Sequence, residues 1–198
     1  MFFETIKMER AAEEVTRQRK KIHPQKFMLW VGMASIVMMF AGLTSAYVVR
    51  QAQGNWVFYK LPFIFWISTA TIFTSSVTMA LAVRAFKKRH MPTFRILTTT
   101  TLVLGIIFGV LQFEGFSILY QNNIRVDGNP SGSFLFIIAG LHLVHIAGGI
   151  IALLIVFFRA FRTRVKVYNA TGLEIVATYW HFVDVLWIYL FVFFLANQ

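Results

Sequence analysis

Ionisable and amide side chains interrupt several otherwise apolar stretches of this sequence, and these are the residues whose types could do chemistry. They are Gln112, Glu114, His142, His145, Glu174, His181 and Asp184. Inside a bilayer an ionisable residue costs at least ~2.5 kcal/mol on insertion scales, so each needs a structural or functional reason. Carboxylates and imidazoles at such depth can pair helices, relay protons or ligate a haem.

Spacing along the chain places two groups of these residues on shared helix faces. Glu174 and His181 are two turns apart, and Asp184 lies one turn beyond His181. His142 and His145 are likewise one turn apart. Because the connection between the two segments is short, we expect a network of polar contacts between them in the interior of a helix bundle.

Three interpretations of this network remain open. The residues lock helices together, which is the interpretation we favour; they relay protons; or an opposed pair of histidines holds a haem, as in a small b-type cytochrome. We predict no catalytic residue and no metal ligand in this chain, because P-loop, dinucleotide-binding and nucleophile-elbow motifs are missing from the sequence. Cysteine is also absent, which excludes disulfides and thiolate metal sites.

The elements that must position these residues are membrane-spanning helices. Hydrophobic residues make up 58% of the 198 residues and charged residues only 14%, against roughly 25% charged in a soluble domain, and the mean hydropathy is +0.66. Uncharged stretches long enough for a ~30 Å hydrocarbon core predict five spans, at about 27–49, 61–83, 96–119, 133–158 and 173–196. The predicted fold class is an all-α integral membrane protein, with a five-helix transmembrane bundle over residues 27–198.

Residues 1–26 precede the first predicted span and carry charges of both signs. Glu13 and Arg17 have the i,i+4 spacing that favours a helix, which Pro24 interrupts. We therefore expect an amphipathic cytoplasmic segment on the membrane surface. The segment is too charged to supply the apolar core of a signal peptide, so we expect it to stay in the mature protein.

Basic residues are distributed unevenly between the two ends of the predicted spans. With loops assigned alternately to the two sides, 16 of the 19 Lys and Arg residues fall on the side of the N-terminus, and Arg50, Lys60 and Arg125 fall on the other. The positive-inside rule then predicts a cytoplasmic N-terminus and a periplasmic C-terminus in a bacterial inner membrane. This placement accounts for the net charge of +11 without nucleic acid, and it predicts contact with anionic membrane lipid along the inner face.

Small residues recur at four-residue spacing in three of the predicted helices, a pattern that lets helix backbones approach closely. The pairs are Ala41 with Ser45, Gly42 with Ala46, Gly105 with Gly109, and Gly148 with Ala152. We expect helix–helix contacts at these positions.

Two of the predicted spans carry sequences that resemble a known family. Residues 174–187 read Glu, six residues, then His-Phe-Val-Asp-Val-Leu-Trp, and residues 140–145 read Gly-Leu-His-Leu-Val-His. Both resemble subunit III of the haem-copper oxidases, which comprise the cytochrome c and quinol oxidases. Residues 40–47, Leu61-Pro62 and Ser75-Ser76 are similar to the first two helices of the five-helix form of this subunit.

The resemblance implies a subunit of an enzyme complex without a catalytic site of its own. Haem and copper would lie in partner subunits, with subunit I in direct contact and subunit II and small subunits nearby. It also implies bound phospholipid and a role in the stability, proton uptake and durable turnover of the complex. We expect cytochrome c as the electron donor and quinol as the alternative. For lipid contact or proton uptake the candidate residues are Gln112, Glu114, Arg159 and Arg162.

Two positions depart from the family pattern. Ser35-Ile36 stands where the family often has Ser-Glu, and Glu114 follows Gln112 one place earlier than in the family's Gln-x-x-Glu. A shift of one residue rotates a helical side chain by about 100°. The resemblance therefore does not assign Glu114 to the pocket of the family's glutamate.

Overall fold

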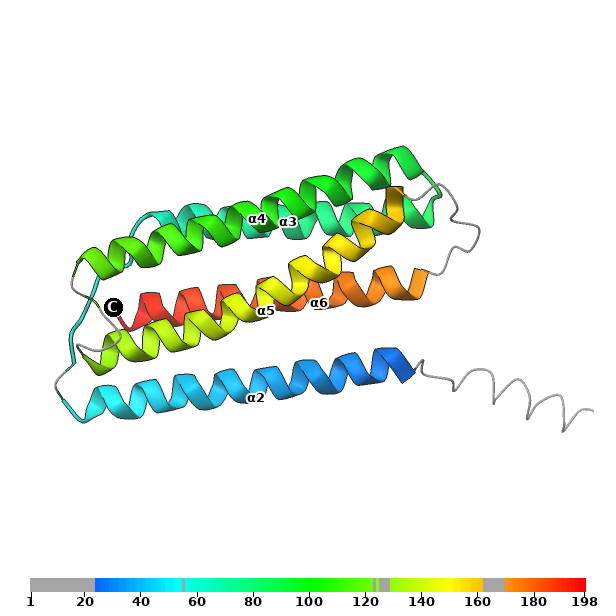
Figure 1. Ribbon diagram of the computed structural model, residues 1–198. Coiled ribbons are helices and arrows are strands. Elements are labelled where there is room, and N and C mark those ends of the chain that lie inside the picture. Colours follow the sequence, from blue (N-terminus) through cyan, green and yellow to red (C-terminus); the bar gives the residue numbers. More distant parts are fainter. Residues whose placement is uncertain (1–23, 55, 123, 125–128, 162–169) are drawn as a thin grey trace, which may run out of the picture.

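The computed structural model describes residues 24–54, 56–122, 124, 129–161 and 170–198. Within these residues the chain forms five helices, α2 (Pro24–Ala52), α3 (Ile64–Lys87), α4 (Met91–Gln121), α5 (Pro130–Phe161) and α6 (Ala170–Ala196). Each helix is long and apolar enough to cross a membrane, which confirms the predicted all-α class with five spans. The helices lie side by side with their axes roughly parallel to one another (Figure 1). Most of the predicted amphipathic segment, residues 1–23, lies outside the described residues.

The helices extend beyond most of the uncharged stretches because the charged residues at their ends are helical as well. Arg84 and Lys87 lie in the last turn of α3, and Arg159 lies in the last turn of α5. At about 1.5 Å per residue the 31 residues of α4 span ~46 Å, more than the ~30 Å hydrocarbon core. Helix α3, in contrast, begins at Ile64 and so later than the predicted start at residue 61, because Pro62 disfavours helical geometry in the residue before it.

Successive helices alternate in direction, so most of the described basic residues gather at one end of the bundle. We call this the basic end; it carries Lys26, Arg84, Lys87, Lys88, Arg89, Arg95 and Arg159. The other end, which we call the opposite end, carries Arg50 and Lys60 among the described residues.

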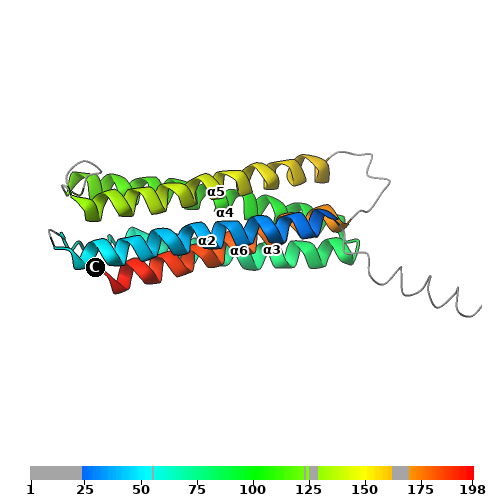
Figure 2. The same cartoon turned by 90° about the horizontal axis from the view of Figure 1, so that it is seen from below.

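Helices α3, α4, α5 and α6 form a ring in which each packs against the next, and α6 closes the ring on α3. Helix α2 lies outside this ring, against α5 and α6 (Figures 1 and 2). The connection from α3 to α4 is short, and Arg89 takes a left-handed φ of 61° there. Its amide and that of Lys88 bond back to carbonyls of Phe86 and Arg84. This helix end makes α3 and α4 antiparallel neighbours.

One series of buried residues in each of α4 and α6 follows alternating steps of four and three residues. In α6 the series is Leu173, Ala177, Trp180, Asp184, Trp187, Phe191 and Phe194, and in α4 it is Phe94, Thr98, Thr101, Gly105, Phe108, Gln112, Gly115 and Leu119. Val183, Leu186 and Leu190 of α6 and Leu102 of α4 are buried beside these series. Such steps are typical of helices that interdigitate their side chains along a seam. The polar residues Gln112 and Asp184 therefore lie in the core of the bundle and not on its outer surface.

Trp180 of α6 lies in a tightly packed part of the ring. A Cβ atom added to Gly105 of α4 would lie 2.8 Å from the indole Cη2, and one added to Gly149 of α5 would lie 3.0 Å from Cε3. Both distances are shorter than normal carbon–carbon contacts, so the ring fits only because these residues are glycines. The indole N–H donates to Ser75 Oγ of α3 at 3.2 Å. Trp180 thus contacts all three other helices of the ring.

The small residues expected at helix contacts divide into two groups. Gly105 meets Trp180, and a Cβ atom on Gly148 would lie 3.8 Å from the Tyr179 hydroxyl. Gly42 and Gly109 have no described atom within 4 Å of the place where a Cβ would lie, apart from their chain neighbours and the nearby backbone of their own helix. Spacing therefore located the α4 contact at Gly105, but it did not distinguish faces that pack from faces that do not.

Replacing Gly105 by Ala should destabilise the bundle by ~1–3 kcal/mol, because the Trp180 ring cannot shift without disturbing three helices. Gly109→Ala is the matched control, since it lies about one turn away on α4 with open space at its Cβ position. Alanine favours a helix over glycine by up to ~1 kcal/mol, so the control should be neutral or stabilising. Unfolding of the purified chain in mixed micelles, followed by circular dichroism, measures both. Equal effects of the two substitutions would contradict the packing described.

Candidate functional site

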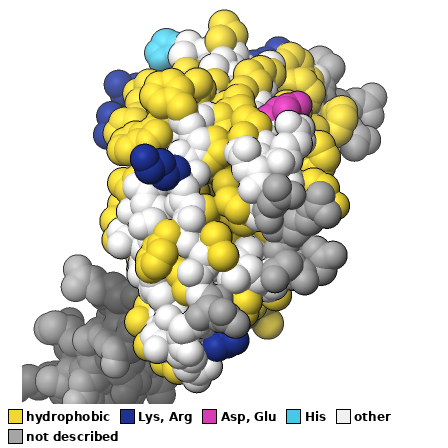
Figure 3. Space-filling view, turned by 90° about the vertical axis from the view of Figure 1, so that its left-hand side faces the viewer, with side chains coloured by type: hydrophobic (Ala, Val, Ile, Leu, Met, Phe, Trp, Pro, Cys, Tyr) yellow, Lys and Arg dark blue, Asp and Glu magenta, His cyan; other side chains and the backbone are white. Residues whose placement is uncertain are grey.

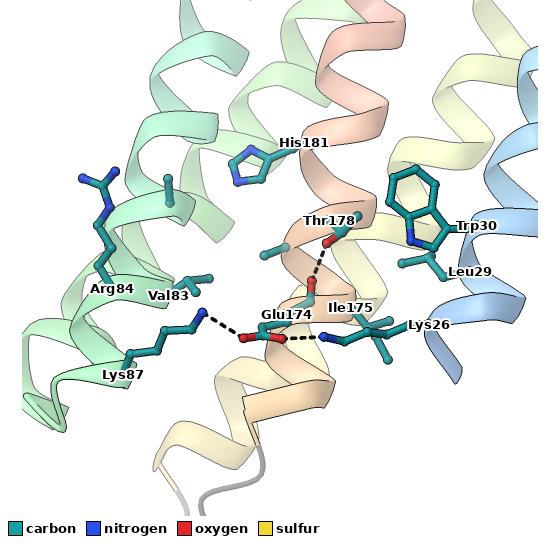
Figure 4. Close-up of a pocket in the computed structure, with 12 residues that line it drawn as sticks. Lys26, Leu29, Trp30, Val83, Arg84, Lys87, Glu174, Ile175, Thr178 and His181 are labelled. Atoms are coloured by element: carbon teal, nitrogen blue, oxygen red, sulfur yellow. Dashed lines mark hydrogen bonds and ion pairs between the residues drawn. The ribbon is translucent and has the colours of Figure 1, made fainter. Parts of the chain in front are cut away.

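Glu174 joins three helices at the basic end. Its Oε2 lies 2.8 Å from Lys26 Nζ of α2, and its Oε1 lies 2.9 Å from Lys87 Nζ of α3 (Figure 4). One carboxylate near the start of α6 therefore holds α2 on one side and α3 on the other. Because all three side chains are partly exposed, each ion pair contributes about 0–1 kcal/mol.

A groove of about 590 Å³ lies beside this bridge, between α2 and α3, with α6 as its floor. Its cationic residues are Lys26, Arg84 and Lys87, and its apolar walls include Leu29 and Trp30. Arg84 forms no ion pair with any residue that the structure describes, and in Figure 4 its guanidinium extends away from the bridge. The groove combines an excess of positive charge with apolar walls, a lining that suits an amphipathic anion.

His181 lines the same groove and makes a second polar contact between α6 and α3. Its Nδ1 lies 2.6 Å from Ser76 Oγ. Farther along α6, the indole N–H of Trp187 donates to Thr69 Oγ1 of α3 at 3.0 Å. Polar side chains of α6 thus meet hydroxyl groups along the length of α3.

Two ionisable side chains, those of His142 and Asp184, lie buried in the core. His142 is fully buried and Asp184 is 2% exposed, and none of their side-chain nitrogen and oxygen atoms has a hydrogen-bond partner among the described residues. The ring of His142 stacks on Trp187, with centroids 5.3 Å apart, and it meets Phe40 and Phe108 edge-on. Aromatic rings therefore surround this imidazole.

His145 is engaged with the backbone of its own helix. Its Nδ1 lies 2.7 Å from the Leu141 carbonyl oxygen, and it must donate because a carbonyl can only accept. The carbonyl oxygen of His145 accepts a hydrogen bond from the Tyr179 hydroxyl of α6 at 3.1 Å. Helices α5 and α6 are thus joined through Tyr179, a residue that the sequence did not single out.

The structure brings Glu174 and His181 to one groove, and their polar partners belong to α2 and α3. No hydrogen bond or ion pair in the described part of the chain links them, or Asp184, to the histidines of α5. The expected polar network between α5 and α6 stays a prediction. Within the same residues, no three His, Cys, Asp or Glu side chains lie close enough together to hold a metal ion.

The four residues expected to serve lipid contact or proton uptake lie apart from one another. Gln112 is buried, and its Nε2 donates to Ser68 Oγ of α3 at 2.8 Å. Glu114 is exposed on the outward surface of α4. Arg159 is exposed at the basic end, and Arg162 lies outside the described residues.

Lys26, Arg84 and Lys87 were missed as site residues by reasoning from the sequence alone. They lie at the ends of uncharged stretches and were counted only as charges on one side of the membrane. A signal did exist, because Glu174 is an acidic residue placed on the side that carries most of the cations. An unlike charge among many like charges is a candidate partner for them.

Known proteins resemble this chain over most of its length. Residues 58–196 match the family described as "Cytochrome c oxidase subunit III". The "Cytochrome c oxidase subunit 3" of Corynebacterium diphtheriae is 31% identical over 164 residues, which cover 79% of this chain and 80% of that protein. The "Probable cytochrome c oxidase subunit 3" of Nocardia farcinica is 31% identical over 166 residues, covering 81% and 82%. The "Cytochrome c oxidase subunit 3" of Bacillus sp. (strain PS3) is 24% identical over 167 residues, covering 82% and 80%.

Lys87→Gln should lower the stability of the chain more than Lys88→Gln. Lys87 pairs with Glu174, whereas its neighbour Lys88 pairs with no carboxylate that the structure describes. We expect a difference of about 0.5–1 kcal/mol, as for partly exposed pairs. The difference should shrink in about 1 M NaCl, where the screening length falls to ~3 Å. Thermal unfolding at low and high salt measures it, and equal losses in the two variants at low salt would argue against the bridge.

Proposed function

The chain belongs to the cytochrome c oxidase subunit III family, and from this membership we propose that it is a non-catalytic subunit of a proton-pumping haem-copper terminal oxidase. An oxidase subunit III implies other oxidase subunits. In our proposal the chain contacts subunit I directly, with subunit II and small subunits in the same complex, and those partners hold the haem and copper. Its own contribution is to stabilise the dioxygen-reducing subunit and to keep proton uptake durable during turnover.

The observation that carries this proposal is that polar side chains of α6 bond to side chains of other helices. Glu174 pairs with Lys26 and Lys87, and His181 meets Ser76. These side chains join α6 to two other helices. Residues engaged in this way support a structural role better than a role in binding and converting a substrate.

An independent b-type cytochrome fits these contacts less well. A haem of that kind needs axial ligands on its two faces, with the macrocycle between them. His142 is fully buried against Trp187, Phe40 and Phe108. His145 donates its Nδ1 proton to a backbone carbonyl. The space that a porphyrin would need next to His142 is occupied by aromatic side chains.

We further propose that the basic end faces the cytoplasm of a bacterial cell and that the groove holds a phospholipid of the inner leaflet. Cytoplasmic ends of membrane helices carry an excess of Lys and Arg. Basic pockets between helices on that side suit anionic headgroups. The phosphate would lie near Arg84 and Lys87, and the acyl chains would lie along Leu29 and Trp30. Arg159 adds positive charge at the same end.

Cytochrome c is our proposed electron donor for the complex, and quinol is the alternative. The relatives described above carry the name cytochrome c oxidase. Oxygen uptake by the purified complex, measured with each donor in turn, separates the two. Uptake with quinol alone would overturn our choice.

Preparing the oxidase without this chain tests the supporting role. We expect the haem spectrum and the initial rate of dioxygen reduction to remain, because the cofactors lie in partner subunits. We expect activity to be lost after fewer turnovers than in the complete complex, and the lifetime to recover when the chain is added back. Immediate loss of dioxygen reduction with an unchanged haem spectrum would contradict a non-catalytic role.

Arg84→Gln should reduce the anionic phospholipid retained by the purified complex about fivefold, since one basic residue near a membrane surface contributes ~1 kcal/mol. Arg84 suits the test because its loss breaks no ion pair in the described chain. Lys88→Gln, at the same end but outside the groove, is the control. Mass spectrometry of the bound lipid measures retention. If both variants keep equal amounts, the groove is not the lipid site.

A further inference from the structure

Glu114 is placed unlike the other acidic residues that the structure describes. Glu174 is paired and Asp184 is buried, whereas Glu114 is exposed and forms no ion pair with any described residue. On the same face of α4, Val110 one turn before it is 57% exposed and Ile118 one turn after it is 37% exposed. Figure 3, which looks onto the opposite end, shows hydrophobic side chains over much of the described surface there. A carboxylate thus interrupts an apolar outer surface.

The depth of Glu114 can be read from two helices. Gln121, the last residue of α4, lies seven residues farther along, which corresponds to ~10 Å. The adjacent Gly115 abuts Phe65 of α3, whose ring centroid lies 6.1 Å from that of Trp187. Trp187 lies nine residues before the end of α6, which corresponds to ~14 Å. Glu114 therefore lies about two to two and a half turns inside the opposite end, within the apolar stretch of α4.

The direction of α4 makes it difficult for this carboxylate to reach the nearer membrane surface. In an α-helix the Cα–Cβ bonds tilt toward the helix N-terminus, and α4 begins at the basic end. The side chain of Glu114 therefore leans toward the middle of the membrane. Its short stem cannot extend to the interface as the stems of Lys and Arg do. Ionisable residues at such depth usually meet a partner, because exposure to lipid is costly.

We propose that the α4 face formed by Val110, Glu114 and Ile118 is a contact with a transmembrane helix of another oxidase subunit, which presents an Arg or Lys side chain to the carboxylate. The two cations that the structure describes at the same end, Arg50 and Lys60, do not pair with Glu114. A cation on a neighbouring helix would form a charge-assisted hydrogen bond shielded from water. The inference rests on family membership, which implies neighbouring subunits. It does not depend on the phospholipid groove, which lies at the basic end.

Photo-crosslinking in the intact oxidase identifies what covers this face. A photoreactive phenylalanine analogue replaces Val110, one turn from Glu114, and the irradiated complex is digested and analysed by mass spectrometry. We expect an adduct with a transmembrane peptide of another subunit that contains Arg or Lys. Adducts with lipid alone would overturn the proposal, as would a peptide without a basic residue.

Substitution of Glu114 tests the charge itself. Glu114→Leu should lower the amount of this chain that stays with the oxidase in detergent by at least about tenfold, because it leaves the partner's cation buried and unpaired. The same change should raise the melting temperature of the chain expressed without partners, since it removes an unpaired carboxylate from an apolar surface. These opposite signs separate a lost interface from a folding defect. Unchanged retention in the complex would refute the contact.

A charge exchange provides the matched control. Glu114→Arg should release the chain from the oxidase, because two cations would then meet. Changing the crosslinked basic residue of the partner subunit to Glu should restore retention of the Glu114→Arg chain. Failure of this reciprocal exchange, with both proteins present in the membrane, would count against a direct ion pair.

Discussion

The indole of Trp180 fixes the position of α6, and most of the polar geometry of the molecule depends on it. Gly105 and Gly149 admit the ring from two neighbouring helices, and Ser75 of a third accepts its N–H. A rotation of α6 by one residue would turn the ring by about 100°, away from the two glycines that make room for it. The orientation of Glu174 and the other polar residues of α6 follows, because they belong to the same helix.

The contacts of each ionisable side chain depend on its depth in the bundle and on the direction in which it points. At the basic end Glu174 binds two lysines in partly exposed pairs, and somewhat deeper His181 meets a hydroxyl group. In the core, Asp184 lies in the same seam as two tryptophans, and His142 stacks on one of them. Glu114 is the exception, because it points out of the bundle. The three acidic residues that the structure describes thus take three different places: Glu174 joins helices, Asp184 is buried in the core and Glu114 faces outward.

Much of the fold could be predicted because it depends on local properties. A span needs ~20 apolar residues, and each of the five uncharged stretches became a helix. The candidate site could be predicted only in part. Glu174 and His181 were expected to share a face, and both line one groove. Their partners Lys26 and Ser76 were not anticipated, since they lie 148 and 105 residues away in the sequence. The departure of Glu114 from the family's spacing drew attention to it, but its exposure could not be foreseen.

By itself, the sequence determined that the chain has five helices able to cross a membrane, and the run from Glu174 to Trp187 indicated its family. Both are properties of contiguous residues. Which helix each side chain meets, including the fit of Trp180 between Gly105 and Gly149, follows from the packing of the bundle. The physical reason is that helical spacing sets the angle of a side chain about its own axis. What lies at that angle depends on how helices far apart in the sequence pack together.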